Sequence, residues 1–350
     1  MTLELTACQS AYQRSRSITP RNAAPVSIRH LGVRSDIGQH GSETIGELSV
    51  GCHSPTPSAY RRWHDRTRRG GEHVSNERTH YGTTTDGITI GGTVHGQGPP
   101  LVFWHGAYGD GELDWQALLP HLTGRFTCYL PSWRGRGLSD EHPDLSYGRR
   151  VDDVLAYVDS LEEPTGLVGW SGGASPAVAA AAQSDSLNGV ALIEPTMGSV
   201  MDEQERVAFG GAVACMGELA DEGRLADAVR AAAGFPFNDE EIAVAEDAGY
   251  FEAAGRYVPN LLNVFQQLME YEGPIADDPA VLGAISIPVL VLHGADTKPF
   301  WIRSARHVAD HVSNARIQEI PAAGHAASLT HPEVLAEALA EFFSPPPQLV

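Results

Sequence analysis

Gly166-Leu167-Val168-Gly169-Trp170-Ser171-Gly172-Gly173 places a serine among glycines directly after an apolar step. Leu167 and Val168 indicate the end of a buried strand. The next five residues fit the pattern Gly-x-Ser-x-Gly, in which a strand turns sharply into a helix. Small flanking residues allow such a serine a strained backbone conformation with its hydroxyl projecting. We therefore expect the chemistry of this protein at Ser171.

The residues after the serine favour a helix. The segment from Ala174 to Gln183 is mostly alanine, and Pro176 falls in the first turn, where a missing N–H costs little. The N-terminus of this helix would direct free N–H groups at an anion that forms beside Ser171. A chance match to the pattern is the alternative in a chain with 37 glycines among 350 residues, and the surrounding elements decide against it.

Strands and helices alternate on both sides of the serine, which predicts an α/β fold with a mostly parallel sheet and helices on both faces. A helix is indicated between residues 151 and 161, where Val151, Val154, Leu155, Val158 and Leu161 recur at three and four residues. The apolar runs that we interpret as strands are Leu101–Trp104, Phe126–Leu130, Gly189–Ile193, Val289–Leu292 and Arg316–Ile320.

The alternation is interrupted between residues 195 and 285, where the pattern is helical and irregular. A helical block inserted in a sheet domain is most simply a cap over the site. We therefore predict a core formed by residues 80–194 and 286–343, with a helical cap at 195–285. Residues 1–79 are poor in apolar side chains and show no periodicity, which predicts a disordered N-terminal extension.

Composition excludes several classes of function. The net charge is −20 for the whole chain and −24 for the part after residue 80, and such an acidic surface repels nucleic acid. The arginine cluster around Trp63 could touch an acidic surface, but a solvated arm is the simpler interpretation. No apolar run approaches the roughly 20 residues of a membrane-spanning helix. The four cysteines form no Cys-x-x-Cys pair, so we expect neither a disulfide framework nor a zinc site.

Four motifs together resemble the α/β-hydrolase superfamily over about residues 80–343. Besides the serine turn, His105-Gly106-Ala107 is similar to the oxyanion loop of that family, and Arg134-Gly135-Arg136-Gly137 with Ser139 is similar to its Arg-Gly-x-Gly-x-Ser loop. Gly324-His325, which follows a strand, resembles the loop of the catalytic histidine. The resemblance implies an α/β-hydrolase fold with Ser171 as nucleophile and His325 as base.

The sequence leaves two candidates for the acid of the triad. Many members of the family carry an aspartate in the spacing Gly-x-x-Asp after the strand that is here Val289–Leu292. This chain has Thr297 at that position and Asp296 one place earlier. Other members use an acid after the strand that follows the serine helix, where this chain has Glu194 before Pro195. We favour Glu194, as in the zearalenone-degrading lactonases that the chain resembles in this respect, and keep Asp296 as the alternative acid.

A serine hydroxyl needs a base to remove its proton and a carboxylate to orient that base, and Ser171, His325 and Glu194 would supply these roles. The backbone N–H groups of Ala107 and Gly172 would stabilise the oxyanion. This chemistry requires no metal and no cofactor. Trp170 and Trp133 are candidates to line the substrate pocket, although core packing explains them equally well.

These residues predict a serine hydrolase that cleaves a carboxylic ester or lactone of a small apolar molecule. Two alternatives stay open: a C–C bond hydrolase or lyase with the same triad, and a non-catalytic ligand receptor that retains the fold. We expect a small-molecule substrate, no nucleic-acid or membrane partner and possible homo-oligomers in the cytoplasm.

Overall fold

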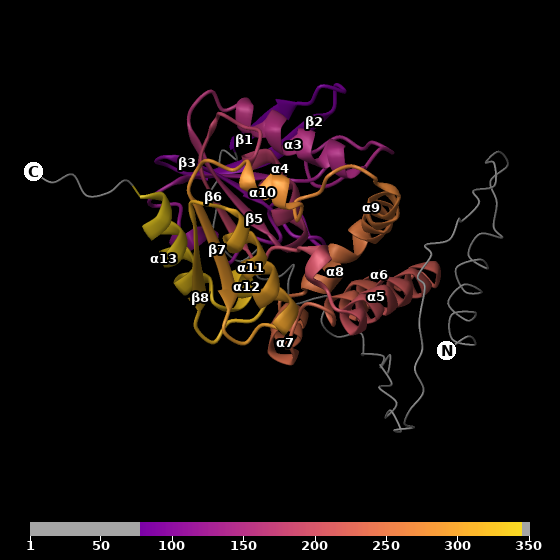
Figure 1. Ribbon diagram of the computed structural model, residues 1–350. Helices are drawn as coiled ribbons and strands as arrows, with labels where there is room; N and C mark the ends of the chain where they lie inside the picture. Colours follow the sequence, from indigo (N-terminus) through magenta and orange to yellow (C-terminus); the bar gives the residue numbers. More distant parts are fainter. Residues whose placement is uncertain (1–77, 345–350) are drawn as a thin grey trace, which may run out of the picture. The chain divides into compact units, whose positions relative to one another are not determined.

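The computed structural model describes residues 78–344, which form one mixed sheet with helices on both faces (Figure 1). The sheet has eight strands in the order β1-β2-β4-β3-β5-β6-β7-β8. β1 pairs with β2, and β2 with β4, in antiparallel fashion, whereas all later pairs are parallel. The expected α/β-hydrolase fold is confirmed. The predicted extension at residues 1–79 lies almost entirely outside the described residues.

The sheet begins earlier in the chain than the sequence patterns indicated, because β1 and β2 precede the first expected strand, Leu101–Trp104. Their bounds are β1 Arg78–Thr83, β2 Thr89–Gly96, β3 Pro100–Trp104, β4 Thr127–Pro131, β5 Thr165–Trp170, β6 Leu187–Ile193, β7 Val289–Gly294 and β8 Ala315–Ile320. All side chains of β3, β5 and β7 are buried, as expected for parallel strands covered on both faces.

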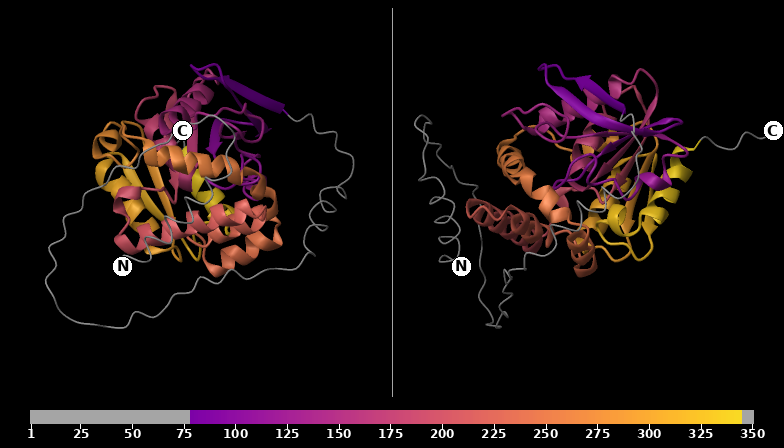
Figure 2. Two further views of the ribbon diagram at one scale, coloured as in Figure 1. Left: turned by 90° about the vertical axis from the view of Figure 1, so that its right-hand side faces the viewer. Right: turned by 180° about the vertical axis from the view of Figure 1, so that it is seen from behind.

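Alternate side chains of the central strands enter two separate cores. Val102, Val190 and Val291 pack on one face, against helices α3 (Tyr147–Asp159), α4 (Ala174–Ala181), α10 (Pro279–Gly283) and α11 (Pro299–His311). Phe103, Ala191 and Leu292 pack on the other face, against α13 (Pro332–Phe343) and the segment around Leu118. The helices therefore cover both faces of the sheet (Figures 1 and 2).

The predicted cap region is helical and lies in the chain between β6 and β7. Its helices are α5 (Glu203–Asp221), α6 (Leu225–Ala233), α7 (Asp239–Asp247), α8 (Tyr250–Ala254) and α9 (Val258–Glu270). They gather at one side of the sheet (Figure 1). Asp202 and Asn238 close capping boxes with Glu205 and Glu241, which fix the first turns of α5 and α7.

Short elements complete the fold at the turns. The four-residue helix α12 (Ala327–Thr330) precedes α13, and single 3₁₀ turns occur at Leu119–His121, Ser171–Gly173, Gly198–Val200 and Gly255–Tyr257. Over residues 78–344, no helix combines the length and apolar character needed to cross a membrane.

Candidate active site

Ser171 lies in the turn between β5 and α4, as the sequence pattern predicts. Its backbone has a φ of +53°, a left-handed conformation that a non-glycine residue adopts only under strain. The turn is also crowded, because a Cβ atom at Gly173 would come within 2.0 Å of the carbonyl oxygen of His105. Glycine at 173 therefore lets the elbow approach the loop after β3.

Ser171, His325 and Glu194 form one hydrogen-bonded chain of side chains. Nε2 of His325 is 2.9 Å from Oγ of Ser171, and Nδ1 of His325 is 3.2 Å from Oε2 of Glu194. The three residues follow β5, β8 and β6, so they meet at the carboxyl edge of the parallel strands, where ligands and catalytic groups gather in open α/β sheets. The solvent-exposed fraction of Ser171 is 9%, whereas His325 and Glu194 are almost completely buried.

Glu194 is the candidate acid that reaches the histidine. It follows β6 in a left-handed conformation with a φ of +49°. Its Oε1 accepts the backbone N–H of Gly294 at 2.6 Å, and its Oε2 accepts the hydroxyl of Thr297 at 2.8 Å. Asp296 lies next to this group, but its side chain points to solvent. The residue in the more usual position of the acid, Thr297, therefore supports an acid supplied by the neighbouring strand.

Burial sets the proton affinities of the acid and the base in opposite directions. It raises the pKa of Glu194 to about 8, against the lowering effect of the bonds from Gly294 and Thr297. It lowers the pKa of His325 to about 3, against a raising effect of the Glu241 carboxylate. Because Glu194 and His325 are in contact, they titrate as a pair. Between pH 3 and pH 8 we expect this pair to bind one titratable proton.

The loop after β3 lies against the first turn that follows the serine. A Cβ atom at Gly172 would be 3.2 Å from the Cβ of Ala107, so the two predicted oxyanion donors belong to neighbouring residues. His105 shapes this loop: its Nδ1 is 2.8 Å from the carbonyl oxygen of Gly106, and its Nε2 accepts the N–H of Trp133 at 3.0 Å.

The buried carboxylate of Asp114 also holds the loop after β3. Oδ2 of Asp114 accepts the N–H of Gly106 at 2.9 Å, and its Oδ1 accepts the hydroxyl of Tyr250 on the cap helix α8 at 2.8 Å. Burial raises the pKa of Asp114 to about 7. The bond to Tyr250 ties the position of the loop to that of the cap.

The two tryptophans predicted to line the pocket are almost completely buried. The indole N–H of Trp170 donates to the carbonyl oxygen of His325 at 3.0 Å, which positions the histidine loop. Trp133 is stacked on His105, with ring centroids 5.0 Å apart. Their contact with a substrate stays a prediction, and the partners observed here are residues of the protein.

The cap contacts both loops that carry the acid–base pair. Nζ of Lys298, just after Thr297, donates to the carbonyl oxygens of Gly234 and Phe235 at 2.7 and 2.8 Å. Oε1 of Glu241 on α7 accepts the backbone N–H of Ala326, the residue after His325. The loops that carry Thr297 and His325 are therefore both held by residues of the predicted cap region.

Aromatic side chains surround the histidine. The ring centroid of Trp301 on α11 is 4.0 Å from that of His325, and the ring centroid of Phe237, which follows α6, is at 6.0 Å. Tyr108 of the oxyanion loop contacts Phe237 edge to face. These rings give the surroundings of His325 an apolar character.

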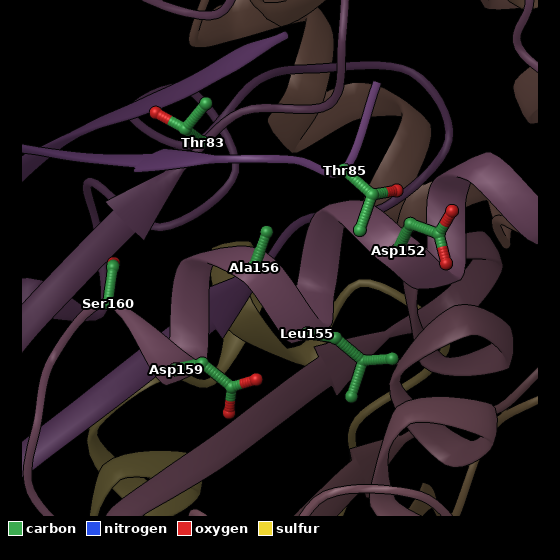
Figure 3. A pocket seen from close by; sticks show the side chains of 7 residues that line it. All are labelled: Thr83, Thr85, Asp152, Leu155, Ala156, Asp159 and Ser160. Carbon is green, nitrogen blue, oxygen red and sulfur yellow. The ribbon is translucent and has the colours of Figure 1, made fainter. Parts of the chain in front are cut away.

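A surface hollow lies away from these residues. A depression of about 490 Å³ between β1 and α3 is lined by Thr83, Thr85, Asp152, Leu155, Ala156, Asp159 and Ser160 (Figure 3). None of these residues belongs to the chain of Ser171, His325 and Glu194. Within the described part of the chain, no group of three or more His, Cys, Asp or Glu side chains is arranged to hold a metal ion.

Comparison with known families agrees with the fold. The pattern of the "Alpha/beta hydrolase family" matches residues 101–338, more than half of the chain. The chain belongs to the α/β-hydrolase family. The match spans β3 to α13 and so includes the serine turn, the cap and the histidine loop.

Curated members of this family carry different activities. The chain is 25% identical over 264 residues to 2-hydroxy-6-oxo-6-(2'-aminophenyl)hexa-2,4-dienoic acid hydrolase of Metapseudomonas resinovorans, covering 71% of this chain and 85% of that protein. It is 28% identical over 252 residues to pimeloyl-[acyl-carrier protein] methyl ester esterase of Chromobacterium violaceum, covering 70% and 94%.

A third relative matches over a shorter segment. Pyrrolizixenacetamide deacetylase of Xenorhabdus hominickii is 37% identical over 91 residues, which are 25% of this α/β hydrolase and 34% of the deacetylase. The match thus spans about a third of that protein. Taken together, the relatives identify a hydrolase family without identifying the bond that this member cleaves.

Sequence reasoning missed the residues that contact the hydrogen-bonded group of Ser171, His325 and Glu194. In the sequence, Thr297 is only a departure from the usual aspartate, whereas in the structure its hydroxyl donates to Glu194. Glu241 and Asp114 carry no motif of their own. Their roles depend on contacts between cap and core, which the order of residues does not reveal.

Proposed function

We propose that this α/β hydrolase is a serine hydrolase that cleaves a carboxylic ester or lactone of a small apolar molecule. The observation that carries the proposal is the hydrogen-bonded chain Ser171–His325–Glu194, with Ser171 on a strained turn. Serine at this position argues against the halide- and epoxide-opening chemistries of relatives that need an aspartate there.

In the proposed reaction, Oγ of Ser171 attacks the substrate carbonyl while Nε2 of His325 takes the hydroxyl proton. The backbone N–H groups of Ala107 and Gly172 stabilise the oxyanion of the tetrahedral intermediate. Collapse of the intermediate expels the alcohol, which receives the proton from His325, and leaves an acyl-enzyme on Ser171. Water, activated by His325, then releases the acid and restores the serine.

Glu194 would orient the imidazole and balance the positive charge that forms on it during both steps. The aromatic rings of Trp301 and Phe237 beside His325 support an apolar substrate. The methyl ester esterase among the relatives is consistent with ester cleavage.

Cleavage of a C–C bond with the same triad is the second candidate. One relative is named for a keto-dienoic acid that contains no ester group, and it aligns over 71% of this chain. The two candidates share the nucleophile and the base and differ in the substrate. A turnover screen over esters and lactones of graded size, with a dienoic keto acid included, separates them.

The first experiment tests the nucleophile. Ser171→Ala should abolish hydrolysis of a short p-nitrophenyl ester and labelling by a fluorophosphonate, with a thermal melting temperature close to that of the wild-type protein. The matched control is Asp296→Asn, which changes an exposed carboxylate beside the site and should leave labelling intact.

Retained turnover in Ser171→Ala would disprove the assignment of the nucleophile. A wild-type protein that melts cooperatively but neither labels nor turns over any ester, lactone or keto acid would favour the receptor alternative. A larger loss of activity in Asp296→Asn than in Glu194→Gln would overturn the choice of acid, and comparable losses would mean that the two carboxylates share the role.

A further inference from the structure

Two buried arginines, Arg136 and Arg150, contact the ring of one tryptophan next to the proposed oxyanion site. The guanidinium carbon of Arg136 is 4.7 Å from the ring centroid of Trp133, and that of Arg150 is 4.2 Å from it. The residues come from the loop after β4 and from α3, and Arg136 and Arg150 are only 1% and 5% exposed.

Each arginine holds one of the two residues whose N–H groups would bind the oxyanion. Nη1 of Arg136 donates to the carbonyl oxygens of Ala107 and Gly109 at 2.7 and 2.9 Å. Nη2 of Arg150 donates to the carbonyl oxygen of Gly172 at 3.1 Å. Arg136 therefore contacts the Ala107 side of the proposed oxyanion site, and Arg150 contacts its Gly172 side.

Within the described residues, no ion pair neutralises the positive charges of Arg136 and Arg150. The neighbouring Arg134 pairs with Asp153 and Asp86, whereas within residues 78–344 neither Arg136 nor Arg150 has a carboxylate at ion-pair distance. Nη2 of Arg136 and Nε of Arg150 are buried without a hydrogen-bond partner. Burial lowers the pKa of each guanidinium to about 10, so both remain charged at neutral pH.

A buried arginine that is not paired with an anion lowers the stability of the folded protein. A role for its charge in the function of the protein would account for such a residue. Contact with the face of Trp133 offsets part of that cost. The charge acts most strongly on an anion that forms nearby in the same water-poor interior.

We propose that Arg136 and Arg150 are positioning residues for the oxyanion site: they fix the Ala107 and Gly172 backbones and place two positive charges behind the oxyanion. This inference rests on the serine hydrolysis proposed above. It also gives the site a charge distribution that matches the transition state, with guanidinium groups behind the oxyanion and the carboxylates of Glu194 and Glu241 around the imidazolium.

Arg150 is the better residue to test, because it makes a single hydrogen bond whereas Arg136 makes three. Arg150→Met keeps an unbranched apolar side chain and removes the charge, and Arg150→Lys keeps the charge. Removing a direct oxyanion donor typically costs about 100- to 1,000-fold in kcat, so an indirect charge should cost roughly tenfold or more. We expect this loss in kcat of Arg150→Met on a p-nitrophenyl ester, with little change in KM and with substantial recovery in Arg150→Lys.

A pair of inhibitors distinguishes an electrostatic role from a structural one. An alkyl trifluoromethyl ketone adds to Ser171 and places an oxyanion in the site, whereas the corresponding methyl ketone binds without adding. Arg150→Met should weaken the fluorinated inhibitor by the same factor as kcat and leave the methyl ketone unchanged. If Arg150→Met does not fold, as judged by its thermal melt, Arg150→Gln takes its place in the same measurements.

Equal weakening of both ketones, or wild-type affinity for both, would overturn the inference, as would a lysine variant no better than the methionine variant. These outcomes are distinct from failure of the proposed function. In that case the wild-type protein itself would show neither fluorophosphonate labelling nor ester turnover, and the inference would fall with the function on which it rests.

Discussion

Replacing Glu194 by glutamine should abolish catalysis and at the same time stabilise the fold at alkaline pH. In the variant the side-chain amide would donate a hydrogen bond to Nδ1 of His325, so that the ring carries its proton on Nε2, facing Ser171. A histidine in that tautomer cannot accept the serine proton. Loss of the corresponding acid in a serine protease lowers kcat by about 10,000-fold, and we expect a loss of that order.

The stability effect follows from the raised pKa of Glu194. Burial moves this pKa from an ordinary value of 4.5 to about 8. The folded protein therefore binds a proton that the unfolded chain releases, and stability is lost as the pH rises from 4.5 to 8. The difference between the two pKa values corresponds to about 5 kcal/mol in the wild-type protein. Glutamine cannot ionise, so the variant keeps this free energy.

Denaturation in urea between pH 6.5 and 9 is the suitable assay. The pKa of His325 falls from an ordinary value of 6.5 to about 3, so its titration affects stability only below this range. The part of the Glu194 effect that remains above pH 6.5 is about 2 kcal/mol. The free energy of unfolding of Glu194→Gln, relative to the wild-type protein, should rise by that amount from pH 6.5 to 9. Asp296→Asn serves as the control and should show no such trend. A difference that stays constant or shrinks with pH would refute the reasoning.

Three further predictions concern the pH dependence of kcat/KM on a p-nitrophenyl ester. In the wild-type protein kcat/KM should rise with pH and level off above about 8, because the Glu194–His325 pair must lose its proton before the histidine can act as a base; a flat profile from pH 6 to 9 would contradict this. Thr297→Val removes a donor that lowers the pKa of Glu194, so the rise should move to higher pH while the plateau is retained; an unchanged midpoint would show that the hydroxyl does not act on the acid. Glu241→Gln keeps an acceptor for the N–H of Ala326 but removes a charge that raises the pKa of His325, so the rise should move to lower pH, and movement in the other direction would exclude an electrostatic role.

The fold and the positions of Ser171 and His325 within it could be predicted because their signals are local. The serine turn is a continuous motif, and Gly324-His325 follows a strand in a fixed order along the chain. The choice between Glu194 and Asp296 could not be made with certainty, since both follow buried strands at the same edge of the sheet. The structure separates them by the directions of their side chains, which depend on the turns after β6 and β7.

Long-range contacts account for what the sequence did not reveal. The helix α5 has no clear apolar stripe and contains Gly210 and Gly211, which weaken helix propensity, so local patterns did not indicate it. Arg150 lies on α3 one residue before the predicted helical stripe begins, and its side chain reaches the carbonyl oxygen of Gly172. Such a side chain is recognised as part of a site only when the packing of α3 against the serine turn is known.

The sheet order also determines when during synthesis the site can become complete. Ser171 and Glu194 follow β5 and β6, two central neighbours that are made before the cap, but His325 follows β8, the last strand in the chain and one edge of the sheet. A growing chain thus holds the serine and the acid for the whole time that the cap is being translated, without a base to activate the serine. In the proposed mechanism the hydroxyl of Ser171 can be activated only after β8 has added to β7, when the helices α5 to α9 have already been made.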